Sequence, residues 1–238
     1  MAFNLNDFNP AEGEYVSKVL TPGTHKCSII DLKLEKPPYD ATQYNLIFVL
    51  EGPEQEEGFE GLQINRLDPS KGNYKGQIGY VKSSQYAYKD WVYKEKPISR
   101  DSSIQSFLGT FLKQVGLLEQ VQAMNISADT IEEFVEEIKV IICKPELVFN
   151  FTISGQKYYK EGYDKPNYSL FFPKKIEGKY AFSSDENIDK LQVFDEAVHI
   201  TERKTSDNTD SAVLTEGFTA APVEDSLFRE NAADLRLP

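Results

Sequence analysis

The sequence is poor in the residues that build metal centres and nucleophilic active sites. It has two histidines and two cysteines among 238 residues, and it contains no Cys-x-x-Cys pair. A zinc site therefore lacks its usual ligands. The phosphate-binding P-loop, the nucleophile elbow and the His-Glu-x-x-His motif are also absent. We expect no metal, no cofactor and no enzymatic activity.

Long apolar runs are missing as well. No stretch approaches the ~18 consecutive apolar residues of a membrane span, and the N-terminus lacks a basic region followed by an apolar one. Neither a membrane-spanning segment nor a secretory signal is expected. Cys27 and Cys143 lie in apolar, strand-like surroundings, which is typical of buried, reduced thiols in a cytoplasmic protein.

Basic residues are concentrated in two segments of an acidic chain. The formal net charge is −12. Residues 63–100 nevertheless carry eight basic side chains against three acids, and residues 157–180 carry six against three. Clustered cations allow one face of an acidic protein to attract a polyanion. The charge distribution therefore favours a nucleic-acid partner more than the net charge suggests.

The first basic segment, 63–100, is interleaved with five tyrosines and a tryptophan. Lysines suit phosphates, and flat rings stack on unpaired bases. The alternative is that the lysines are ordinary surface residues and the rings pack against a sheet or, for Trp91, in the core. A hairpin register that the sequence leaves open decides where Tyr86, Tyr88 and Trp91 point. The candidate contacts are Arg66, Lys71, Tyr74, Lys75, Tyr80, Lys82, Tyr86, Tyr88, Lys89, Trp91 and Lys94.

The second basic segment, 157–180, also combines lysines with tyrosines. Stacking and phosphate contacts are expected here too, and the alternative is a tyrosine-rich loop that packs on itself. Its candidate contacts are Lys157, Tyr158, Tyr159, Lys160, Tyr163, Lys165 and Lys174.

Apolar periodicity predicts a mainly β chain with a helical segment in the middle. The expected strands cover residues 24–34, 44–50, 59–67, 147–153 and 168–172, and the expected helices cover 102–118, 127–138 and 185–199. Residues 140–143 are also strand-like, and Gly155 is expected to end the fourth strand. Within the first strand, apolar residues change parity between Ile29 and Ile30, which predicts a bulge. Residues 80–93 fit either a hairpin or a strand with a short helix.

Three strands, a helical segment and further strands follow the order of the OB-fold, a five-stranded barrel. The opening strands carry Gly23-Thr-His-Lys-Cys-Ser-Ile-Ile-Asp-Leu and Asn45-Leu-Ile-Phe-Val-Leu-Glu-Gly, and the helical segment carries Phe107-Leu-Gly-Thr-Phe-Leu-Lys-Gln-Val-Gly-Leu-Leu. These segments resemble the opening strands and the helix of single-stranded DNA-binding proteins of tailed bacteriophages. Residues 147–153 and 168–173 resemble their closing strands.

The resemblance implies an OB-like domain at residues 23–182, with a helical insertion at about 102–138. An N-terminal arm at 1–22 and an acidic C-terminal helix with a disordered tail at 183–238 flank this domain. The implied function is sequence-tolerant binding of single-stranded DNA in phage replication, recombination or repair, in the cytoplasm of the bacterial host.

The family's tail docks replication or recombination proteins, but its run of acids closed by an aromatic residue is missing here, because the chain ends Leu235-Arg-Leu-Pro238. The tail as a docking element is therefore only a hypothesis. Two other functions fit the same residues: a virion structural or assembly protein, and an accessory subunit of a recombinase or nuclease.

Overall fold

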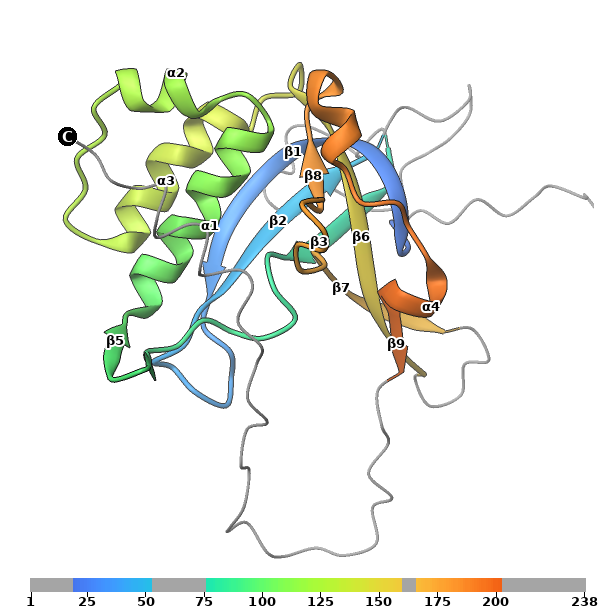
Figure 1. Ribbon diagram of the computed structural model, residues 1–238, viewed down its shortest axis with the longest axis horizontal. Coiled ribbons are helices and arrows are strands. Elements are labelled where there is room, and N and C mark those ends of the chain that lie inside the picture. The colour runs from blue at the N-terminus through green and yellow to red at the C-terminus, as the bar shows by residue number, and fades with distance from the viewer. Residues whose placement is uncertain (1–18, 53–75, 160–165, 203–238) are drawn as a thin grey trace, which may run out of the picture.

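Five strands close into a barrel in the computed structural model. The structure describes residues 19–52, 76–159 and 166–202. The barrel strands are β1 (Gly23–Glu35), β2 (Asn45–Glu51), β3 (Ile78–Lys82), β6 (Val148–Tyr158) and β7 (Asn167–Phe171). The order around the barrel is β1-β2-β3-β7-β6 and back to β1, with only the β3–β7 pair parallel (Figure 1). The prediction of a mainly β chain is confirmed, and the five-stranded barrel is compatible with an OB-like architecture.

A bulge lets β1 serve two sides of the barrel. Its first half pairs with β6 and its second half with β2, and the register with β2 shifts between Ile29 and Asp31. Because side chains alternate along a strand, the extra residue keeps both Ile29 and Leu32 in the core. The predicted bulge is confirmed.

The strand next to β2 lies later in the chain than expected. The predicted strand at 59–67 falls outside the described residues, and β3 (Ile78–Lys82) pairs with β2 instead. A separate two-stranded sheet follows, formed by β4 (Trp91–Tyr93) and β5 (Lys96–Ile98). Neither alternative for residues 80–93 is therefore correct: they contain the end of β3 and all of β4, which belong to different sheets, and β4 forms its hairpin with the later strand β5.

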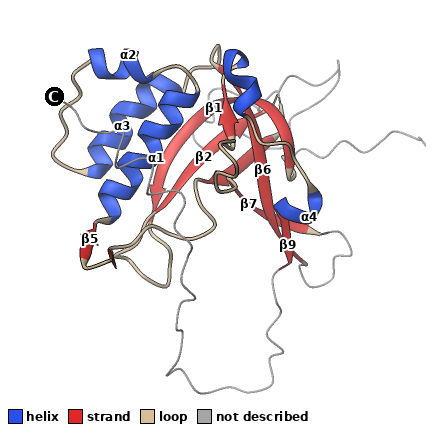
Figure 2. Ribbon diagram, in the orientation of Figure 1, coloured by secondary structure: helices blue, strands red, loops and turns tan. Residues whose placement is uncertain are grey.

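Three helices cover one side of the barrel (Figures 1 and 2). They are α1 (Arg100–Gln114), α2 (Leu118–Ala123) and α3 (Ile131–Ile142). α1 ends before Gly116, whose φ of +80° permits a Schellman turn in which the Leu117 N–H donates to the Leu112 carbonyl at 2.9 Å. The single helix predicted over 102–118 is therefore divided. No helix in the described part of the chain is long and apolar enough to cross a membrane.

α3 continues further than its periodicity predicted. The Thr130 hydroxyl accepts the Glu133 N–H at 3.2 Å at its start, and the helix runs on through Ile142. The strand-like interpretation of residues 140–143 is therefore wrong. Cys27 and Cys143 form no disulfide, and burial raises the pKa of each thiol to about 12. Cys27 is buried, as predicted, whereas Cys143 is only partly buried.

An ion pair fixes α3 to the β1 bulge. Lys139 Nζ lies 2.7 Å from the buried carboxylate of Asp31, which also accepts the Leu32 N–H at 2.9 Å. The hydrogen bond to Asp31 is the main reason that the pKa of Lys139 is raised. A buried carboxylate without such partners is strongly disfavoured, so this pair holds the helix in one position on the barrel.

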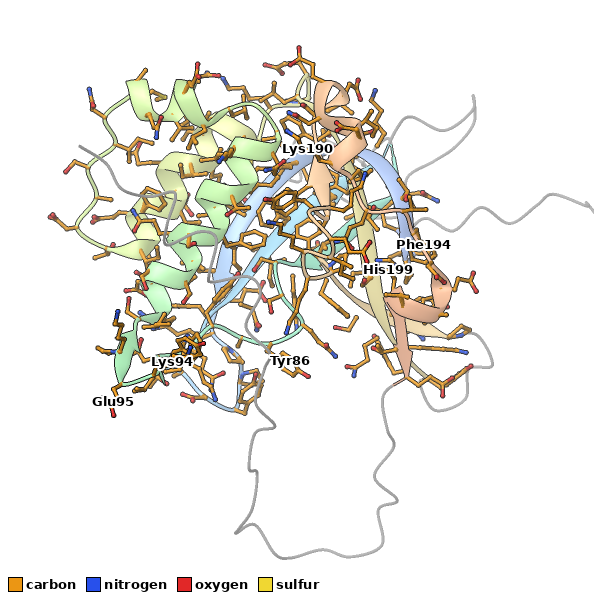
Figure 3. The ribbon with its side chains drawn as sticks, viewed as in Figure 1. Tyr86, Lys94, Glu95, Lys190, Phe194 and His199 are labelled. Carbon is orange, nitrogen blue, oxygen red and sulfur yellow. The ribbon has the colours of Figure 1, made fainter. Side chains whose placement is uncertain are left out.

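Residues beyond the last barrel strand add two short strands that pair with β6, and short helical elements beside them. They comprise β8 (Phe182–Ser183), the 3-10 helix η3 (Asp185–Lys190), α4 (Glu196–His199) and β9 (Ile200–Glu202). The Thr152 hydroxyl donates to the Gln192 carbonyl at 2.6 Å, and buried His199 stacks on Phe194 (Figure 3). The single helix expected over 185–199 is therefore wrong, and the folded domain extends past residue 182 to Glu202. The expected disordered tail lies outside the described residues.

Gly155 does not end its strand, because β6 continues to Tyr158. A Cβ at Gly155 would lie 2.4 Å from the ring carbon Cγ of Pro22 and 3.1 Å from the ring of Tyr168. A Cβ at Gly79 would lie 2.8 Å from Cδ1 of Leu20, a side chain that is 2% exposed. The two glycines therefore leave room for the segment that leads into β1.

We expect Gly155→Ala to lower the free energy of unfolding by about 1–3 kcal/mol, since the added methyl meets a rigid proline ring. Gly79→Ala is expected to cost less, because its methyl would meet an acyclic side chain whose Cδ1 can shift, although Leu20 Cβ also lies 3.0 Å away. Urea denaturation of both variants checks this order. Equal stability of Gly155→Ala and wild type would show that the Pro22 segment moves freely.

Candidate functional site

The β4–β5 hairpin presents aromatic and basic side chains away from the barrel. Its turn residues Lys94 and Glu95 have φ angles of +46° and +66°, as a two-residue type I′ turn requires. The ring centroids of Trp91 and Tyr93 lie 5.9 Å apart, and Lys94 Nζ lies 5.1 Å from the Tyr93 ring centroid. Figure 3 shows Lys94 and Glu95 at the edge of the molecule.

Hydrogen bonds fix the base of this hairpin to the helices. Asp90 accepts the backbone N–H of Arg100 at 2.7 Å, and the Arg100 guanidinium lies 4.2 Å from the ring centroid of Tyr44. The Tyr44 hydroxyl donates to Glu132 of α3, and this bond is the main cause of the lowered pKa of Glu132. The guanidinium also donates to the Thr42 carbonyl at 2.8 Å. Arg100 therefore has a structural role, although it belongs to the first basic segment.

The loop between β1 and β2 contributes a tyrosine that the sequence analysis missed. Tyr39 is 74% exposed, and Asp40 orders its loop by accepting the Thr42 N–H at 2.9 Å. The pKa of Asp40 is lowered, chiefly by the Thr42 hydroxyl and in part by the charge of Lys89. The backbone bridge between Tyr44 and Tyr88 brings the neighbouring Lys89 toward this loop. The sequence did indicate that Tyr39 is exposed, because a tyrosine that follows two prolines has no strand to pack on.

The loop and the hairpin region together form what we call the hairpin patch. It consists of Lys36, Tyr39, Tyr86, Lys89, Trp91, Tyr93, Lys94 and Lys96. Tyr86 is 69% exposed. All four lysines are exposed, and none has a carboxylate within 4.0 Å among the described residues. Among the neighbouring acids, Asp90 accepts the Arg100 backbone N–H and Asp101 accepts from the Arg100 guanidinium, while exposed Glu95 lies in the turn between two of the lysines. The patch therefore offers lysines without an ion pair beside two exposed rings, Tyr39 and Tyr86, and two half-buried rings, Trp91 and Tyr93.

Three further candidates lie before the hairpin. Tyr88 packs against the core and its hydroxyl accepts from the Ser83 hydroxyl at 3.0 Å; burial raises its pKa. Its ring faces inward, so we leave Tyr88 out of the patch. Tyr80 and Lys82 alternate with buried Val81 and therefore lie on the outer face of β3.

The end of β6 carries the second group of candidates, which we call the β6–β7 patch: Lys157, Tyr158 and Tyr159. Tyr159 is 59% exposed. Lys157 Nζ lies 5.4 Å from the Tyr159 ring centroid and 3.9 Å from a Glu202 carboxylate oxygen. The pKa of Lys157 is raised, first of all by the Tyr159 hydroxyl. This patch is therefore less cationic than the hairpin patch.

The remaining candidates are separated from these patches or fall outside the description. Lys174 is exposed but follows the opposite end of β7 from Lys157. The candidates that lie outside the described residues are Arg66, Lys71, Tyr74, Lys75, Lys160, Tyr163 and Lys165.

No family model, curated protein or solved structure matches this chain. In the part of the chain that the structure describes, no three His, Cys, Asp or Glu side chains are grouped to hold a metal ion. Inference about function therefore rests on the barrel and on the two patches.

Proposed function

We propose that this chain is an OB-fold protein that binds single-stranded DNA with little sequence preference and without catalysis. The observation that carries the proposal is the hairpin patch, in which the exposed rings of Tyr39 and Tyr86 stand beside four lysines without carboxylate partners within 4.0 Å. Each stacked base contributes about 1–3 kcal/mol, and every base has a face to stack. Lysines that are not already paired neutralise phosphates and release counterions.

The strand order of the barrel supports the same proposal. OB-folds bind oligonucleotides on the face of their second and third strands and on the flanking loops. The corresponding elements here are the outer face of β3 with Tyr80 and Lys82, the loop with Tyr39, and the end of β6. A role in phage replication, recombination or repair follows from the sequence resemblance and belongs to the proposal.

The test is a titration of fluorescein-labelled oligo-dT with the full chain, followed by anisotropy and by Trp91 fluorescence over a salt series. We expect single strands to bind more tightly than duplex, with log affinity falling against log salt by about 0.7 per phosphate neutralised. The triple variant Lys89→Gln, Lys94→Gln, Lys96→Gln should flatten this slope by about 2.

Lys113→Gln, an exposed lysine in the last turn of α1, serves as the matched control and should keep the wild-type slope. No binding at low salt, or equal affinity for duplex, overturns the proposal. A protein-docking surface, as in a virion component or an accessory subunit, then becomes the better explanation of the patch.

A further inference from the structure

Tyr44 lies where the barrel, the β4–β5 hairpin and helix α3 meet. It is buried and directly precedes β2. Its N–H donates to the Tyr88 carbonyl at 3.1 Å, and the Tyr88 N–H donates to the Tyr44 carbonyl at 2.8 Å. This backbone bridge fixes the chain just before β4 begins. In Figure 1, β5 of the same hairpin lies at the lower end of α1.

Two cations lie over the Tyr44 ring, one from each segment that builds the hairpin patch. Lys36 belongs to the loop between β1 and β2, and its Nζ lies 5.4 Å from the ring centroid. The Arg100 guanidinium, at the base of the hairpin, lies 4.2 Å from the same centroid. Cations are attracted to the face of an aromatic ring, and more strongly where water is excluded. One buried ring therefore links the loop of Tyr39 to the base of the hairpin.

The hydroxyl of Tyr44 connects this ring to α3. It donates to Glu132, and this bond is the main cause of the lowered pKa of Glu132, so the acceptor is an ionised carboxylate at neutral pH. A hydrogen bond to a charged acceptor is stronger than one between neutral groups. The hydroxyl of Tyr88 bonds instead to Ser83, which lies before the hairpin. Of these two bridged tyrosines, Tyr44 is therefore the one that joins the hairpin base to the helix.

We propose that Tyr44 is a positioning residue of the hairpin patch, and that its bond to Glu132 lets α3 set the affinity of the site. This inference rests on the proposed binding of single-stranded DNA. Tyr44 is buried, so it acts through Lys36 and through Arg100, whose backbone N–H donates to Asp90 at 2.7 Å. Loops and side chains that are ordered only on binding cost conformational entropy. Loss of the Glu132 bond therefore weakens binding without removing any group that contacts DNA.

The test compares Tyr44→Phe with Tyr88→Phe in the full chain. Each variant removes one hydroxyl from a tyrosine of the same backbone bridge, but only Tyr44→Phe releases Glu132. We expect Tyr44→Phe to bind oligo-dT about 3-fold to 30-fold more weakly, as is typical of residues that influence a site without touching its ligand. Tyr88→Phe should bind like wild type.

A second measurement needs no DNA. Hydrogen exchange of the β4 and β5 amides, followed by mass spectrometry, reports local opening of the hairpin in the free chain. Exchange should be faster than in wild type for Tyr44→Phe and unchanged for Tyr88→Phe. Urea denaturation verifies that each variant is folded.

Variants of Glu132 supply the rescue. Glu132→Ala removes the acceptor, whereas Glu132→Gln removes the charge but keeps an oxygen that accepts from the Tyr44 hydroxyl. Glu132→Ala should reproduce Tyr44→Phe, and Glu132→Gln should stay close to wild type. Combining Tyr44→Phe with Glu132→Ala should be no weaker than either single variant, because both remove the same bond. Glu132 is exposed on α3, so its variants test the inference even if Tyr44→Phe does not fold.

Each other outcome has a distinct meaning. Wild-type affinity and exchange in both Tyr44→Phe and Glu132→Ala overturn the inference and leave single-strand binding intact. An equal loss in Tyr88→Phe also overturns it, since any missing hydroxyl bond would then have the same effect. If wild type binds no oligo-dT at low salt, the proposed function is overturned, and the exchange rates alone decide whether Tyr44 positions the hairpin.

Discussion

Replacing both Tyr39 and Tyr86 by alanine is expected to weaken the binding of single-stranded DNA by about 30-fold to 10⁴-fold. Each ring stacked on a base contributes about 1–3 kcal/mol, and ~1.4 kcal/mol corresponds to a factor of ten. Both rings are largely in solvent, at 74% and 69% exposure, so the free energy of unfolding should stay within about 0.5 kcal/mol of wild type. Anisotropy titration with oligo-dT and urea denaturation measure the two quantities separately.

The matched control keeps the rings and removes only the hydroxyls. Tyr39→Phe with Tyr86→Phe should bind nearly as well as wild type, because stacking uses the face of the ring. If the double alanine variant also binds like wild type, neither ring touches the strand and the hairpin patch is not the binding surface. A uniform loss in both double variants would instead indicate that the hydroxyls make the contacts.

The barrel was predictable from the sequence because its interior imposes a regular pattern. Cys27 and Ile29 face the core on one side of the bulge, and Leu32 faces it on the other. The change of parity was therefore visible as a shift of apolar positions. β2 was equally visible, since its buried residues continue on both faces.

Features set by contacts between distant segments were not predictable. Glycine weakens a strand locally, so Gly155 looked like a terminator, whereas the approach of Pro22 is what requires it. The hairpin turn uses Lys94 and Glu95, which lack the glycine or asparagine that usually marks a type I′ turn. The pattern over 185–199 is broken into short elements because Gln192 and Thr152 hold that segment on β6.

The sequence predicted which types of residue form the candidate site. It did not predict which of those residues are exposed together on one surface. The sequence grouped Tyr86 and Tyr88 together, yet the first is exposed and the second packs on the core. The backbone pairing of Tyr88 with Tyr44 decides this, and it joins positions that are far apart in the chain. The same pairing brings the loop of Tyr39 beside the hairpin base. The sequence alone does not show that the Tyr39 loop and the hairpin are neighbours.

Phe48→Ala is expected to lower the free energy of unfolding by about 3–5 kcal/mol, a large share of the ~5–15 kcal/mol of a typical domain. Phe48 is fully buried in β2, and its ring centroid lies 5.2 Å from Phe111 of α1 and 5.3 Å from Phe172 beyond β7. The truncation therefore removes contacts between the barrel and the helix that covers it. Urea denaturation followed by circular dichroism measures the loss.

Phe48→Leu separates the cavity from the loss of aromatic contact. It refills most of the volume and should cost clearly less than alanine. Val92→Ala, at an exposed hairpin position, should change stability by less than about 0.5 kcal/mol. If Phe48→Ala lowers the free energy of unfolding by less than about 1 kcal/mol, the packing of α1 on the barrel does not depend on this ring. In that case the hairpin, whose base bonds to Arg100 at the start of α1, would need another source of rigidity.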